Sequence, residues 1–165
     1  MRDIIIQLIG ASAFIFLIWS YYKKEKIQIL FMQILASIIF TIHYYFLSGI
    51  TGAICNFMNA IILLLIYLFE KKEKKKIFLL FTIIPILIFI YYISWENIFS
   101  IFPLIAITLA CVSFLSKNEN TIRIIGIINC VCWIVYGSIY LSYPAIIFNS
   151  ITVITTAIAL IKNRK

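Results

Sequence analysis

The sequence predicts an all-α, polytopic membrane protein with seven membrane-spanning helices. Two observations support this prediction. Hydrophobic residues make up 64% of the 165 residues, giving a mean hydropathy of +1.11, and they fall into seven separate runs. A soluble domain of this size could not cover so much apolar surface. A helix of about 20 apolar residues crosses a hydrocarbon layer of ~30 Å and satisfies its own backbone groups there.

Each apolar run is close to that length and ends at charged or turn-forming residues. The first run ends at Lys23 and the third at the charged stretch 70–76. Ala11-Ser12-Ala13 resembles a signal-peptidase site, but the run continues to Trp19, so we expect a retained first helix. The expected spans are 4–22, 27–47, 50–69, 77–93, 98–115, 122–141 and 144–161.

The distribution of basic residues predicts the orientation. With seven spans, alternate loops place 13 of the 14 Lys and Arg residues on one side of the membrane and only Arg2 on the other. Basic loops are retained in the cytoplasm, so the N-terminus is expected outside and the C-terminus inside. The net charge of +8 then indicates a basic cytoplasmic face that contacts anionic lipids, and no nucleic-acid partner.

Two aromatic–asparagine pairs indicate an internal repeat. Trp133 and Asn149 are 16 positions apart across one turn, and Phe40 and Asn56 are 16 apart across another. The pairs are displaced by 93 residues (133 − 40 and 149 − 56), and this shift also superposes 4–72 on 97–165. We therefore predict two parallel three-helix repeats, 1–72 and 97–165, joined by a linker helix, 77–93, in a 3+1+3 layout.

Polar residues at helical spacing predict an internal binding wall. Asn56 and Asn59 on the third span share one face, as do Asn149 and Thr152 on the seventh. Amides facing lipid would be costly, so these faces point inward. Aromatic side chains beside amides are suited to sugar-like rings. The candidate solute-binding residues are Phe40, Asn56, Asn59, Asn129, Trp133, Asn149 and Thr152.

An alternative role for the same polar residues is interhelical hydrogen bonding, worth ~0.6–2 kcal/mol per bond in membrane bundles. His43, the single histidine, fits a hydrogen-bonded structural role better than a proton-carrying one. Charged residues are absent from the middle of every span, whereas proton-driven transporters usually carry carboxylates there. No catalytic pair or metal-ligand cluster is evident, so we expect no enzyme activity, cofactor or metal. The cysteines are expected to be packing residues: Cys55, Cys111, Cys130 and Cys132.

The layout and the aromatic–asparagine pattern resemble the SWEET and PQ-loop transporter superfamily. Trp133 and Asn149 are similar to the Trp and Asn that line the sugar pocket in its single-repeat bacterial members, with Phe40 and Asn56 as a degenerate twin. The Pro-Gln pair of that superfamily is replaced by Trp19-Ser20-Tyr21-Tyr22. The stretch HYYFLSGITGAICNFMNA, residues 43–60, is similar to the signature of the YgjV family, which implies a bacterial inner-membrane protein.

Two functions follow from these observations. The favoured one is a facilitative transporter of a small neutral polar solute, such as a sugar, that works by alternating access. The alternative is a non-transporting sensor, receptor or assembly factor built on the same scaffold. The sequence leaves the formation of a homo-oligomer open.

Overall fold

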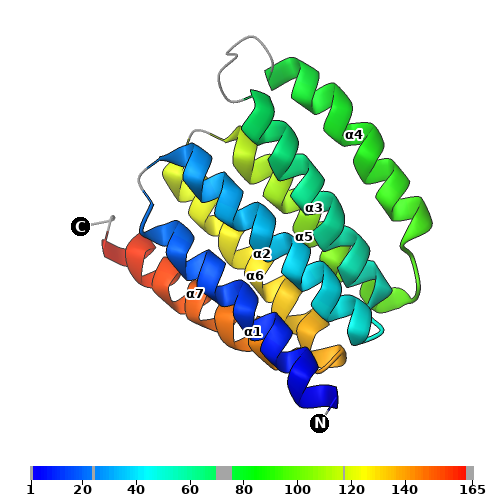
Figure 1. Ribbon diagram of the computed structural model, residues 1–165. Helices are drawn as coiled ribbons and strands as arrows, with labels where there is room; N and C mark the ends of the chain where they lie inside the picture. The colour runs from blue at the N-terminus through cyan, green and yellow to red at the C-terminus, as the bar shows by residue number, and fades with distance from the viewer. Residues whose placement is uncertain (1, 24, 70–75, 117, 163–165) are drawn as a thin grey trace.

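The computed structural model describes residues 2–23, 25–69, 76–116 and 118–162, which form an all-α fold. Figure 1 shows its α-helices lying side by side along a common direction. One 3-10 turn, η2 (Ile98–Ser100), directly precedes the fifth of them. The seven α-helices of the described part are α1 (Arg2–Tyr21), α2 (Lys26–Phe46), α3 (Ile50–Phe69), α4 (Lys76–Ile93), α5 (Ile101–Leu115), α6 (Glu119–Ile139) and α7 (Tyr143–Lys162).

The helices coincide with the predicted spans, and no boundary differs by more than three residues. α6 begins three residues early, at Glu119, because Asn118 caps it. The side-chain oxygen of Asn118 accepts hydrogen bonds from the backbone N–H groups of Asn120, at 3.0 Å, and Thr121, at 3.2 Å. α5 begins three residues late because the 3-10 turn occupies the start of the predicted span.

Within the described residues, five helices are long and apolar enough to cross a membrane: α1, α2, α3, α6 and α7. The apolar segment that includes most of α5, Ile98–Ser113, is shorter. α4 is helical along the whole predicted span, but the side chains of residues 76–84 lie outside the described part. Several basic residues used in the orientation argument also lie outside it: Lys24, Lys71, Lys72, Lys74, Lys75, Lys117, Arg164 and Lys165.

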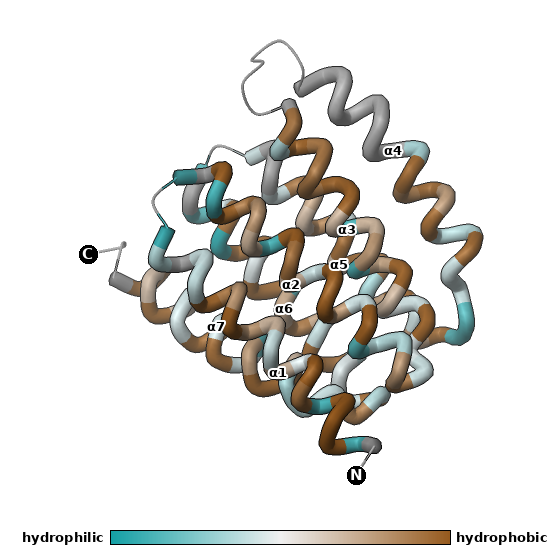
Figure 2. Tube along the Cα trace, viewed as in Figure 1, coloured by the Kyte–Doolittle hydropathy of each residue, from teal (hydrophilic) through white to brown (hydrophobic). Residues whose placement is uncertain are grey.

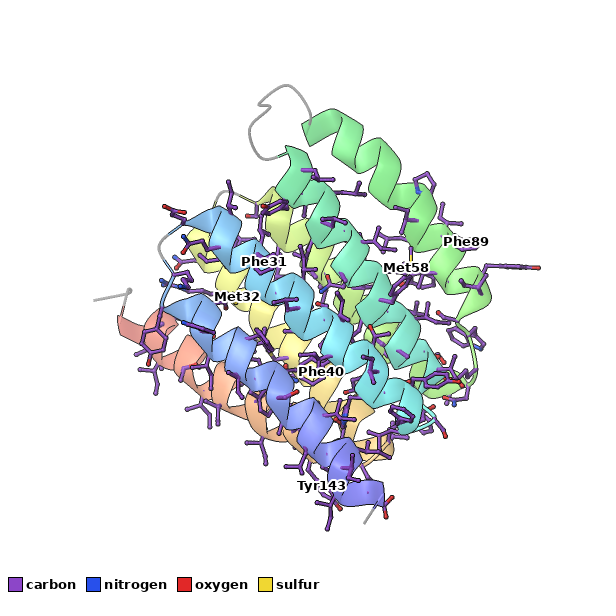
Figure 3. The ribbon with its side chains drawn as sticks, viewed as in Figure 1. Phe31, Met32, Phe40, Met58, Phe89 and Tyr143 are labelled. Atoms are coloured by element: carbon purple, nitrogen blue, oxygen red, sulfur yellow. The ribbon has the colours of Figure 1, made fainter. Side chains whose placement is uncertain are left out.

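The outside of the helical bundle is apolar. Large side chains such as Ile15 on α1 and Ile154 on α7 are 62% and 59% exposed, and Figure 3 shows Phe89 on the outer side of α4. Figure 2 shows brown, hydrophobic residues along the helices, with teal, hydrophilic residues mainly near the helix ends. Such an exterior suits hydrocarbon surroundings, where apolar side chains carry no hydration cost.

The helices pack in two consecutive groups of three. α2 packs between α1 and α3, and α6 packs between α5 and α7. The two groups meet where α1 contacts α7 and where α3 contacts α5. The main contacts of α4 are with α3 and α5, the helices before and after it in the chain. Figure 1 accordingly shows α4 at one edge of the bundle and the two chain termini at opposite ends.

Two turns at the same end of the bundle share one backbone conformation. Ser48, between α2 and α3, has φ 61°, and Leu141, between α6 and α7, has φ 53°. The residue after each closes the turn: Gly49 N–H donates to the oxygen of Tyr44 at 2.9 Å, and Ser142 N–H donates to the oxygen of Gly137 at 2.8 Å. Such bonds satisfy the last helix carbonyls and offset the cost of a left-handed non-glycine residue.

Candidate solute-binding cavity

A cavity of about 250 Å³ lies inside the bundle, among α1, α2, α3, α6 and α7. It is lined by every residue that the sequence analysis proposed for solute binding: Phe40, Asn56, Asn59, Asn129, Trp133, Asn149 and Thr152. Helical spacing brings these residues to the inner faces of four helices, as expected from the sequence. Their role in binding a solute remains a prediction that the geometry alone does not test.

The paired asparagines of α3 and α7 have matching hydrogen bonds. The side-chain nitrogen of Asn56 donates to the carbonyl oxygen of Gly52 at 2.9 Å, and that of Asn149 donates to the oxygen of Ala145 at 2.7 Å. Both bonds reach back one turn along the same helix, so each amide is held in a fixed orientation. The amide oxygens make no hydrogen bond to any described residue, which leaves an acceptor at each of two cavity walls.

Two other amides tie neighbouring helices together beside the cavity. Asn59 donates from its side-chain nitrogen to Ser37 Oγ on α2 at 3.1 Å, and Asn129 donates to the backbone oxygen of Ala106 on α5 at 2.7 Å. These are the interhelical bonds of the alternative role considered above. The Oδ1 atom of Asn59 is buried and has no partner among the described residues. Thr152 donates to the oxygen of Phe148 on its own helix at 2.9 Å.

Aromatic side chains form the rest of the wall. The rings of Trp133 and Tyr44 are tilted against each other with centroids 5.6 Å apart. Phe148 stacks on Phe14 of α1 at 4.9 Å, and Phe40, labelled in Figure 3 on α2, meets the edge of the same Phe14 ring at 6.0 Å. Contacts of this kind hold the rings rigid, so the cavity has an aromatic lining as well as its amides.

Hydrogen bonds between the two groups of helices close one end of the cavity. Two of them start from Gln7 and His43: Gln7 Nε2 donates to the oxygen of Leu141 at 2.8 Å, and His43 Nε2 lies 2.7 Å from Ser142 Oγ. Two more start from α3: Gly52 N–H donates to Tyr136 Oη, and Thr51 Oγ1 pairs with Ser100 Oγ, both at 2.8 Å.

The opposite end of the cavity is lined by residues that lie near the loop between α1 and α2. Leu17 and Ser20 of α1 and Gln33 of α2 line it there. The sequence analysis missed Gln33, Ser37 and Tyr44, although helical spacing contained the signal. Gln33 lies seven residues before Phe40, Ser37 lies three before it, and Tyr44 lies four after it. These spacings place all of them on the same face of α2.

No cluster of three or more His, Cys, Asp or Glu side chains occurs among the residues that the structure describes. The cysteines are free and buried in helices, in agreement with a packing role: Cys55, Cys111, Cys130 and Cys132. Glu96, in the loop after α4, instead accepts a hydrogen bond from Thr51 N–H at 2.9 Å and so caps α3.

These features define an α-helical membrane protein of several spans with a polar cavity inside the bundle. The model of the Imp-YgjV family, described as bacterial inner membrane protein, matches residues 4–165. The chain therefore belongs to the Imp-YgjV family and is a multi-pass bacterial inner-membrane protein. Comparison with curated proteins and with solved structures gave no match.

Proposed function

We propose that this protein is a facilitative transporter that moves a small neutral polar solute, such as a sugar, across the inner membrane by alternating access. The observation that carries the proposal is the polar cavity, which is closed at one end by hydrogen bonds between the two groups of helices. Breaking those bonds while closing the other end would expose the same residues to the other side of the membrane. That exchange is the essential step of alternating access.

The two rocking units are the repeats 1–72 and 97–165, with 77–93 as the linker. Features displaced by 93 residues support this division. Ser48 and Leu141, both with positive φ, are 93 residues apart, as are Asn56 and Asn149 and the carbonyls to which these amides donate. A two-fold relation between the repeats would turn the α1–α7 contact into the α5–α3 contact, and both contacts occur.

The cavity chemistry favours a neutral solute with several hydroxyl groups. The described lining residues carry no formal charge, so a charged solute would find no counter-ion there. The unpaired oxygens of Asn56 and Asn149 can accept hydrogen bonds from hydroxyls, and Trp133 offers an apolar face. The volume of about 250 Å³ lies below the ~300–1,000 Å³ of pockets for drug-sized ligands, which restricts the solute to a small molecule.

The positive-inside rule supports an outside N-terminus and a cytoplasmic C-terminus. In that orientation the closed end of the cavity faces outward, and the structure corresponds to an inward-facing state. The basic inner face would contact anionic lipids. A groove lined by Arg123, Thr155 and Thr156 near that face suits such contact, and it shares Phe148 and Thr152 with the cavity. We propose no enzymatic activity, because the lining consists of amides, hydroxyls, a thiol and apolar groups.

Uptake of labelled monosaccharides into proteoliposomes tests the transport proposal. Asn56→Ala and Asn149→Ala each remove a cavity amide, and we expect either change to abolish uptake in a protein that still folds. Ser138→Ala is the matched control, because Ser138 is exposed on α6 and its hydroxyl bonds only to the backbone of its own helix. Uptake that survives both asparagine changes would rule out this cavity as the transport site.

The second candidate function is a non-transporting sensor, receptor or assembly factor. The interhelical bonds of Asn59 and Asn129 favour it, since packing alone accounts for those two amides. Under this alternative, none of the tested solutes is taken up. Asn59→Ala and Asn129→Ala would then lower the melting temperature more than Asn56→Ala and Asn149→Ala, whose amides bond only to their own helices.

A further inference from the structure

His43 joins three parts of the chain at the closed end of the cavity. It lies on α2 and is fully buried. Its Nδ1 atom is 2.9 Å from the carbonyl oxygen of Ile6 on α1, and its Nε2 atom is 2.7 Å from Ser142 Oγ between α6 and α7. The bond to Ser142 crosses from one proposed repeat to the other. His43 is not among the residues that line the cavity, so the proposed binding of a solute does not explain this side chain.

The partners of the ring define which tautomer a neutral His43 adopts in the closed arrangement. A backbone carbonyl can only accept, so Nδ1 carries the hydrogen and donates to Ile6. Nε2 of the neutral ring can then only accept, and the hydroxyl of Ser142 donates to it. A neutral His43 ring in the closed end is therefore the Nδ1–H tautomer.

Close packing holds the ring in this position. A Cβ atom on Gly10 would lie 2.7 Å from two atoms of the His43 ring, so glycine leaves just enough room on α1. On α2 the rings of Phe40 and Tyr44 lie 6.2 and 5.5 Å from it, measured between centroids. The ring cannot gain hydration while the two groups of helices stay together.

The partners of the ring do not include a carboxylate of any described residue. On α2 the adjacent titratable group is Tyr44, and the α6–α7 turn presents the neutral Ser142. On α1, Asp3 is exposed and lies one turn before Ile6. The carboxylate of Glu96 is occupied by the backbone and hydroxyl of Thr51. Among the described residues no carboxylate bonds to the ring, so an added proton would place an uncompensated cation in a buried site.

We infer that His43 is a proton-binding site, and that a proton on its Nε2 atom opens the end of the cavity that His43 and Ser142 close. The inference rests on the proposed alternating-access function, which supplies the open state. Protonation reverses the bond to Ser142, whose hydroxyl must then accept, and it creates a buried charge that is better hydrated once the repeats separate. The open state binds the proton more tightly, so acid shifts the population towards it.

Distance measurement at the closed end tests the inference. Spin labels on Tyr45→Cys and Tyr143→Cys would report on the two repeats, because both side chains are exposed at that end. The native cysteines are buried and offer little background labelling. In lipid nanodiscs, lowering the pH from about 8 to about 5, the range in which histidine titrates, is expected to shift the distance distribution reversibly to longer values. An unchanged distribution would overturn the inference.

Two further measurements assign the effect to His43. In His43→Gln we expect the pH-dependent shift to be lost, and a shift of the original size would contradict the inference. The second measurement needs no substitution in the ring. Nitrogen NMR of the single imidazole should show the neutral Nδ1–H form at high pH and protonation over the same range as the distance change. A ring that stays neutral while the distances lengthen overturns the assignment.

Solute uptake separates this inference from the transport proposal. Uptake measured at one fixed pH tests transport, whereas the label distances test the proton-dependent opening. Uptake without any pH-dependent distance change would refute the proton site and leave the transport proposal intact. A His43-dependent distance change without uptake of any solute would support the proton site and count against transport.

Discussion

Tyr136 occupies the space that a side chain on Gly52 would need. The N–H of Gly52, at the start of α3, donates to Tyr136 Oη on α6 at 2.8 Å. A Cβ atom on Gly52 would lie 2.4 Å from Tyr136 Cε1, inside any normal contact distance. One hydrogen bond and one missing side chain therefore bring α3 against α6, directly beside the cavity at its closed end.

Gly52→Ala is expected to destabilise the protein by separating α3 from α6. The added methyl group must displace a fully buried tyrosine ring, and overpacking of this kind typically costs ~1–3 kcal/mol. The melting temperature in detergent should fall accordingly. Gly126→Ala is the matched control, because a Cβ atom there meets nothing within 4 Å and alanine favours the helix by about 1 kcal/mol. Equal melting temperatures for the two variants would contradict the packing argument.

Glu96 is expected to stabilise the start of α3 from a distant part of the chain. Its carboxylate accepts from the N–H and the hydroxyl of Thr51, at 2.9 and 3.0 Å. Loss of a capping acceptor costs ~0.5–2 kcal/mol, so Glu96→Ala should lower the melting temperature, and Glu96→Gln should lower it less because an acceptor remains. Glu25→Gln is the control, since Glu25 bonds only to the exposed Gln28. A fall as large in the control as in Glu96→Ala would show that charge alone matters.

Trp133→Ala should weaken solute binding through loss of the apolar face. Aromatic contacts contribute ~0.5–1.5 kcal/mol beyond burial, which corresponds to about 2- to 12-fold in dissociation constant. Trp133→Phe should retain part of this affinity. Calorimetric titration of the purified protein with the transported solute provides the measurement. Trp95→Ala is a control, because Trp95 is 49% exposed in the loop after α4, away from the cavity. Unaltered affinity in Trp133→Ala would exclude stacking on this ring.

The helices and the cavity lining were predictable because they follow from periodicity along the chain. Apolar runs and charged ends set the spans, and helical spacing turned Asn56 and Asn149 inward. The positive φ of the two turns, which lie 93 residues apart, could not be predicted, because neither turn has a glycine at that position. Ser48 and Leu141 adopt positive φ, a conformation that neither residue type announces in a sequence.

The network that closes the cavity could not be predicted from the sequence. His43, Gln7 and Glu96 find partners 37 to 134 residues away, and each partner depends on how the two groups of helices meet. Pairings of this kind have no periodic signal. The sequence favoured a hydrogen-bonded structural role for His43, and its ring makes two hydrogen bonds, the same bonds from which the proton site is inferred.

Cross-linking at the closed end should stop transport if the two repeats rock against each other. Gln7 and Leu141 already meet there, with Gln7 Nε2 2.8 Å from the oxygen of Leu141. Leu141 is 59% exposed, so a cysteine there is accessible to a short thiol cross-linker. We expect Gln7→Cys with Leu141→Cys to lose uptake once cross-linked with a reducible reagent, and to regain it on reduction.

The matched control for this experiment places both cysteines in the first repeat, at Tyr45→Cys and Ile50→Cys. These exposed side chains flank the α2–α3 turn and both line one groove on the outside of the bundle. A link between them joins parts of one repeat, which move together under the proposal, so uptake should persist. If the control link also abolished uptake, the moving units would have to be individual helices. If neither link affected it, the closed end would not open during transport, because a solute that leaves the cavity by another route has no need to separate Gln7 from Leu141.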